Sequence, residues 1–103
     1  MKNKLITILI ATALSNPTFA APTTTFGVSD CGKWIKEPSE ARKGWVLGFL
    51  SGLNAIEAYK NSLSKVSSGE QIFLWMDNFC KANPLSDTLN GSIYLLIELT
   101  QKK

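Results

Sequence analysis

Histidine is absent from this chain of 103 residues, and cysteine occurs only twice, at Cys31 and Cys80. Without histidine the chain lacks the usual general base near neutral pH and the commonest metal ligand. Two separated cysteines cannot by themselves form an ordinary zinc site, and no Cys-x-x-Cys motif is available for redox exchange. The sequence therefore predicts a protein that is not an enzyme and that holds neither a metal nor another cofactor.

Acidic residues add little to this chemistry. Glu57 and Asp77 are the carboxylates that lie within apolar sequence. A buried pair of carboxylates could transfer protons, but carboxylates at such places are more often the solvated edges of amphipathic helices. We therefore predict that both side chains are solvated and that no catalytic residues are present.

A long apolar segment is also missing, although the start of the chain contains a short one. Lys2 and Lys4 precede an apolar stretch over residues 5–14. This order is typical of a secretory signal peptide, and the small residues that follow place the expected cleavage between Ala20 and Ala21. The stretch is shorter than the roughly 20 residues that span a bilayer, so we predict export without a membrane span.

An excess of charge of one sign is missing as well. The chain has 11 basic and 8 acidic residues, and two of the basic ones lie in the signal peptide, which leaves nine against eight and a net charge of +1. Nucleic-acid binding needs a cluster of Lys and Arg that this near-neutral chain lacks, so we predict no nucleic-acid partner. We expect three regions: a signal peptide over residues 1–20, a flexible lead over residues 21–30 and one helical domain over residues 31–103.

The two cysteines fit an exported protein. Cysteines of a small domain in an oxidising compartment such as the periplasm form disulfides. A bond between Cys31 and Cys80, 49 positions apart, would stabilise the fold by about 4 kcal/mol in the chain-entropy model. We predict a periplasmic protein with this intrachain disulfide, and a disulfide between two chains is the alternative.

The pattern of apolar residues predicts an all-α fold. Apolar residues recur every three or four positions, and no segment alternates apolar and polar residues as a strand does. The first expected helix is short, starts at about Cys31 and ends before Pro38. A long helix follows, with Ser39 as its N-cap, and runs from Glu40 to about Leu63. The third helix begins at capping boxes over residues 67–71 and ends at Asn83, and the last helix is capped by Ser86 or Asp87. We predict a compact bundle of three to four helices in which the disulfide joins the first helix to the third.

The long helix is apolar around most of its circumference, so we expect it to run through the centre of the bundle. Val46 and Leu50 are among the residues that widen its main apolar stripe. That stripe consists of Ala41, Trp45, Phe49, Gly52, Ile56, Tyr59 and Leu63. The sequence predicts that the stripe faces the core.

Three glycines, Gly44, Gly48 and Gly52, follow one another at intervals of four residues on this helix. Each costs about 1 kcal/mol of helix propensity relative to alanine, but glycines on one face let another backbone approach closely. Packing within the chain is the first interpretation, and a groove for a protein partner or for a second copy in a homodimer is the second. Trp45 and Trp75 are candidate anchors at such an interface, although tryptophan is more often a core residue.

These features together resemble known small exported proteins. The resemblance lies in Cys31 with the nearby Trp34, in the glycine-rich segment 44–52, and in the sequence Phe-Cys-Lys-Ala-Asn-Pro at 79–84 before a last helix. The layout is similar to that of periplasmic single-disulfide helical proteins of the HdeA/YmgD type and of the Rap1a/Tai immunity type. In size and layout it also resembles small exported proteins of conjugative plasmids, such as KikA.

The resemblances imply a function based on protein binding. The HdeA type implies an acid-activated chaperone, and the Rap1a/Tai type implies a protein that neutralises a secreted effector in the periplasm. We expect a non-enzymatic periplasmic protein that binds another protein, in an immunity role or as an accessory to a secretion system. A conjugation protein with an effect on the host cell and an acid-activated chaperone are the alternatives. Because the charges are nearly balanced, the sequence shows no special acid trigger for a chaperone.

Overall fold

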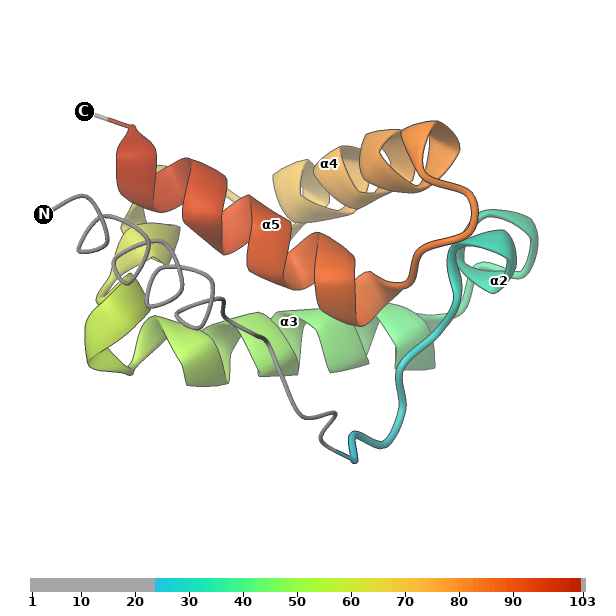
Figure 1. The fold of residues 1–103 in the computed structure, drawn as a ribbon, viewed down its shortest axis with the longest axis horizontal. Coiled ribbons are helices and arrows are strands. Elements are labelled where there is room, and N and C mark those ends of the chain that lie inside the picture. The colour runs from blue at the N-terminus through green and yellow to red at the C-terminus, as the bar shows by residue number, and fades with distance from the viewer. Residues whose placement is uncertain (1–23, 103) are drawn as a thin grey trace, which may run out of the picture.

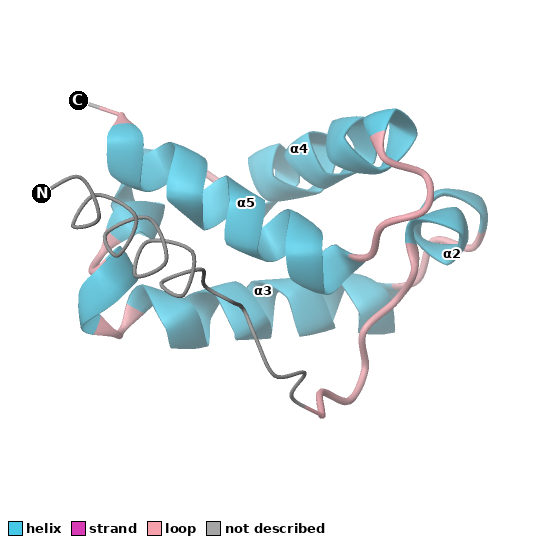
Figure 2. Ribbon diagram, viewed as in Figure 1, coloured by secondary structure: helices cyan, strands magenta, loops and turns pink. Residues whose placement is uncertain are grey.

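The computed structural model describes residues 24–102. These residues form four α-helices and two short 3-10 helices, and they contain no strand beyond one antiparallel bridge between Asp30 and Asp87 (Figure 2). The elements are α2 (Cys31–Lys36), α3 (Glu40–Asn54), η1 (Glu57–Tyr59), η2 (Ser62–Lys65), α4 (Gly69–Ala82) and α5 (Thr88–Gln101). The predicted all-α bundle of three to four helices is confirmed. The predicted signal peptide and its cleavage site between Ala20 and Ala21 lie outside the described residues.

The helices begin where polar side chains satisfy their first backbone N–H groups. Ser39 Oγ and Asp87 Oδ1 each accept a hydrogen bond from the backbone N–H three residues later, at 3.0 and 2.8 Å. Both predicted N-caps are thus confirmed. The predicted capping boxes of α4 do not form: Ser68 makes no side-chain cap, and Gln71 Oε1 instead accepts from the backbone N–H of Ser67 at 2.7 Å.

Helix α5 occupies the centre of the bundle, between α3 and α4 (Figure 1). Its buried residues are Thr88, Gly91, Ser92, Leu95, Leu96 and Leu99. In α3 only Val46 and Leu50 are buried. The prediction that the long helix runs through the centre is therefore wrong, because α5 contacts two helices whereas α3 forms one outer layer.

The apolar stripe predicted for the long helix faces the core only in part, because Trp45, Tyr59 and Leu63 pack against the core while Ile56 is exposed. None of its seven residues is fully buried: Trp45 and Phe49 are half-buried, and Ala41 and Gly52 are exposed. The core side of α3 is formed by Val46 and Leu50, which were predicted only to widen the stripe. Because apolar residues surround most of this helix, its sequence does not determine which side is buried.

Helix α3 also ends earlier than predicted, at Asn54 rather than near Leu63. The backbone carbonyl of Asn54 accepts from the N–H of Asn61 at 3.0 Å, and its side-chain Oδ1 accepts from the N–H of Leu63 at 2.8 Å. Asn61 has a left-handed backbone with φ of 54°, a conformation that asparagine tolerates better than most residues. These contacts replace the last two helical turns by η1 and η2.

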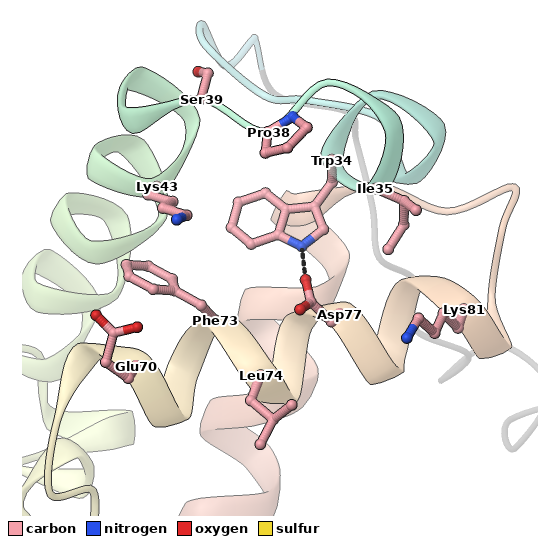
Figure 3. A pocket seen from close by; sticks show the side chains of 10 residues that line it. All are labelled: Trp34, Ile35, Pro38, Ser39, Lys43, Glu70, Phe73, Leu74, Asp77 and Lys81. Atoms are coloured by element: carbon pink, nitrogen blue, oxygen red, sulfur yellow. Dashed lines mark hydrogen bonds between the residues drawn. The ribbon is translucent and has the colours of Figure 1, made fainter.

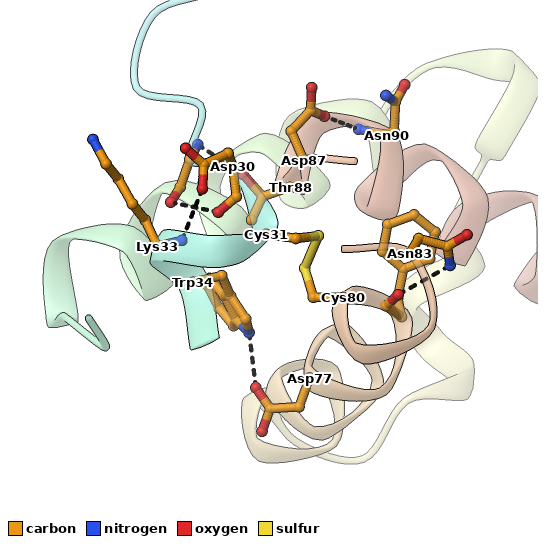
Figure 4. Close-up of a disulfide and its surroundings, with 12 residues drawn as sticks. Asp30, Cys31, Lys33, Trp34, Asp77, Cys80, Asn83, Asp87, Thr88 and Asn90 are labelled. Carbon is orange, nitrogen blue, oxygen red and sulfur yellow. Dashed lines mark hydrogen bonds between the residues drawn. A yellow bond between two sulfur atoms is a disulfide. The ribbon is translucent and has the colours of Figure 1, made fainter. Parts of the chain in front are cut away.

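The disulfide joins Cys31 in α2 to Cys80 in α4, with a Cα–Cα distance of 5.0 Å (Figure 4). The predicted intrachain bond is confirmed, and it links the first helix to the third as expected. Beside it, the backbone of Ser29 is fixed to α5: Thr88 N donates to Ser29 O at 2.9 Å, and Ser29 N donates to Thr88 Oγ1 at 3.1 Å. The end of the lead predicted to be flexible is therefore part of the folded domain.

Candidate functional site

The three helical glycines lie on an exposed surface, which we call the α3 glycine face (Gly44, Gly48 and Gly52). A Cβ added to any of them would have no other part of the described chain within 4 Å. Within residues 24–102, these glycines therefore do not serve the packing that was the first interpretation. The second interpretation, a groove for a protein partner or for a second copy, stays a prediction.

A stacked aromatic pair flanks the α3 glycine face. The rings of Trp45 and Phe49 lie 4.9 Å apart with an interplanar angle of 11°. Trp45 Nε1 donates to the backbone carbonyl of Phe26 at 2.7 Å, and its indole lies against Gly27, whose φ is 87°. Trp45 thus secures the N-terminal lead and keeps part of its ring at the surface, since it is only half-buried.

A second surface is the Trp34 groove, a hollow of about 460 Å³ where α2, α4 and the start of α3 meet (Figure 3). The rings of Trp34 and Phe73 line it with centroids 6.3 Å apart. Trp34 Nε1 donates to Asp77 Oδ1 at 2.8 Å. Lys43 Nζ lies 5.3 Å from the centre of the Phe73 ring, at a distance that suits a cation–π contact.

Asp77 corrects one expectation from the sequence. It was predicted to be a solvated helix edge like Glu57, and Glu57 is indeed exposed. Asp77 is only half-exposed, and its carboxylate satisfies the indole N–H of a tryptophan that is 5 % exposed. Its role is structural, because it allows Trp34 to be buried with its polar atom paired.

The third surface is the α4–α5 hollow, of about 480 Å³. It is lined by Trp75, Phe79, Asn83, Tyr94, Ile97, Glu98 and Gln101. Trp75 stacks on Phe79 with ring centroids 5.5 Å apart and an interplanar angle of 9°, and Phe79 lies 5.7 Å from Tyr94. Tyr94 is 59 % exposed and Ile97 is 39 % exposed.

The sequence predicted Trp75 as an interface residue but not Tyr94, which lines the same hollow. The signal for this hollow was the pair of aromatic residues four positions apart on α4, Trp75 and Phe79, which places them on one helix face. Which residues of α5 face Trp75 and Phe79 depends on how α5 is rotated against α4. The two helices meet at Gly91, where an added Cβ would lie 2.5 Å from Met76 Sδ.

Residues 24–102 contain no group of three or more His, Cys, Asp or Glu side chains placed to hold a metal ion. Among the helices of the same residues, none is both long enough and apolar enough to cross a membrane.

The chain was also compared with protein-family models, with curated proteins and with solved structures, and none of the three comparisons gave a match.

Proposed function

We propose that this chain is an exported periplasmic protein without enzymatic activity, and that it acts by binding another protein through the α3 glycine face. An immunity role, or an accessory role in a secretion system, is the biological context that we favour. The observation that carries the proposal is that Gly44, Gly48 and Gly52 lie exposed in a helix and have no neighbour within 4 Å of an added Cβ.

The three glycines of α3 destabilise the helix, and no contact within the described chain offsets this effect. Each glycine inside a helix lowers stability by about 1 kcal/mol relative to alanine. Glycines that permit close packing offset that cost by the contacts they allow, as Gly91 does between α5 and α4. The glycines of α3 gain no such contacts from the described chain. A backbone that approaches from a partner protein would supply them, because a row of glycines forms a shallow groove along a helix.

The aromatic pair beside the groove supports a protein partner. Trp45 and Phe49 are half-buried, stacked and partly fixed by the lead, so little side-chain entropy would be lost when a partner covers them. Large aromatic residues of this kind carry much of the binding energy in protein interfaces. The Cys31–Cys80 disulfide adds rigidity and fits an oxidising compartment.

The proposal is tested by capture of partners from periplasmic extract with the tagged, exported product of the full chain. Gly48→Leu fills the groove, and Ala58→Leu makes a comparable change at an exposed residue of η1. We expect a stoichiometric partner at neutral pH that is retained by Ala58→Leu and lost by Gly48→Leu. A partner retained by Gly48→Leu contradicts the glycine face. Many proteins captured only in acid would overturn the proposal in favour of the chaperone.

A further inference from the structure

The α4–α5 hollow combines aromatic rings with a single charge. Trp75, Phe79 and Tyr94 supply three rings, of which Phe79 contacts both of the others. Glu98 is the one charged residue among those that line the hollow. Trp75 Nε1 donates to Glu98 Oε1 at 3.2 Å, so the carboxylate is held next to the rings.

Glu98 forms no ion pair with any residue that the structure describes. Glu98 and Trp75 also line a neighbouring hollow, and Lys65 and Lys102 are among its other residues. There the ammonium of Lys65 donates to the carbonyls of Leu99 and Lys102, at 2.8 Å each, and so caps the end of α5.

We infer that the α4–α5 hollow binds an arginine side chain presented by a protein partner. A guanidinium group stacks on aromatic rings and donates to a carboxylate in a planar, two-pronged arrangement, and it gives up water more readily than an ammonium does. Ile97, at the same surface, would contact the aliphatic part of the side chain. The residues that line the hollow include one carboxylate and no Lys or Arg, so their charge is opposite to that of this ligand.

This site is distinct from the α3 glycine face and goes beyond the function proposed there. The hollow is formed by α4 and α5, whereas the glycines lie on α3, at the other edge of the molecule from α4 (Figure 1). The open shape of the hollow, with Tyr94 59 % exposed, suits a side chain projecting from a folded protein more than an enclosed small molecule. The two surfaces can therefore be tested independently.

The three tryptophans make the test possible, because each lies at a different surface. Trp34 lies in the Trp34 groove, Trp45 beside the α3 glycine face and Trp75 in the α4–α5 hollow. The indole N–H signals of ¹⁵N-labelled, exported protein are followed by NMR during titration with acetyl-Leu-Arg-Leu-amide. The matched control peptide contains citrulline, which has the shape of arginine without its charge. We expect the Trp75 signal to shift with the arginine peptide, while the Trp34 and Trp45 signals stay in place.

Two variants locate the interaction. Glu98→Gln keeps a hydrogen-bond acceptor for Trp75 but removes the charge, and should weaken binding about threefold, as expected for a surface ion pair. Tyr94→Ala should weaken it about as much through loss of a ring. Glu70→Gln in the Trp34 groove and Gly48→Leu on α3 should leave binding unchanged. No Trp75 shift, an equal shift with the citrulline peptide, or unchanged binding by Glu98→Gln would each overturn the inference.

Discussion

Glycine has two opposite roles in this small domain. Gly91 is buried where α5 meets α4, and an added Cβ would lie 2.5 Å from Met76 Sδ and 3.0 Å from Phe79 Cδ2. Gly48 is exposed in the middle of α3, where an added Cβ would meet nothing within 4 Å. The first glycine is needed for folding. The second lowers the stability of the fold, and no packing contact compensates for this loss.

This contrast predicts opposite effects for the same substitution. Gly48→Ala should raise the free energy of unfolding by about 1 kcal/mol, because alanine is the better helix former and has free space there. Gly91→Ala should lower it by about 1 kcal/mol, since overpacking exceeds the gain in helix propensity. Urea unfolding followed by circular dichroism measures both. A loss of stability in Gly48→Ala would show that the glycine face is covered within the molecule.

Local chemistry at single residues was predictable from the sequence, whereas the role of the glycines was not. Ser39 and Asp87 act as N-caps because their side chains bond to backbone three residues away. Spacing shows that Gly44 and Gly48 share one helix face, but it does not show whether that face is covered. Whether the face is covered depends on contacts between helices, and the local spacing of residues does not predict those contacts.

At the level of elements, helix α3 shows where periodicity stops being informative. Its apolar pattern continues through Ile56 and Tyr59, so the helix was predicted to reach Leu63. The structure ends it at Asn54, whose carbonyl and amide oxygens accept from the backbone after the turn. The two asparagines, Asn54 and Asn61, were the available signal, because asparagine favours turns and left-handed backbone.

The disulfide is one of the contacts that hold α2 against α4, beside the hydrogen bond from Trp34 to Asp77. Helix α2 has six residues, too few to be stable alone, and its cysteine is joined to α4. Replacing Cys31 and Cys80 together by alanine should therefore lower the free energy of unfolding by about 4 kcal/mol. Thermal and urea unfolding under oxidising conditions measure the loss. Because both cysteines are buried, the reduced wild-type protein serves as the control that separates the cross-link from the lost sulfur volume.

The outcome that would contradict this prediction is equal stability of the oxidised wild type and the double variant. A smaller loss in the reduced wild type than in the double variant would measure how much of the effect comes from packing of the two sulfur atoms. The position of this bond between the first and third helices was predictable, since an intrachain pairing of the only two cysteines has one solution.

For the whole molecule, the fold class followed from the sequence but the arrangement did not. The four helices of the described residues match the expected bundle, yet α5 rather than α3 lies at its centre. Gly91 lets α5 approach α4 closely, and the buried leucines Leu95, Leu96 and Leu99 of α5 belong to the core. The longest apolar helix is therefore an outer layer with one exposed side, and that exposed side is where we place the partner.

The proposed export and the disulfide together give a prediction about the whole chain. We predict that the full chain expressed in a bacterium yields a periplasmic product that begins at Ala21 and is oxidised, because residues 1–20 have the order of a signal peptide and the periplasm supports disulfide formation. Intact mass and N-terminal sequencing of the periplasmic fraction measure both features. Deletion of residues 2–20 should leave the protein in the cytosol with Cys31 and Cys80 reduced and open to alkylation without prior reduction. An oxidised cytosolic product would separate the disulfide from export, and a periplasmic product that keeps residues 1–20 would contradict the cleavage.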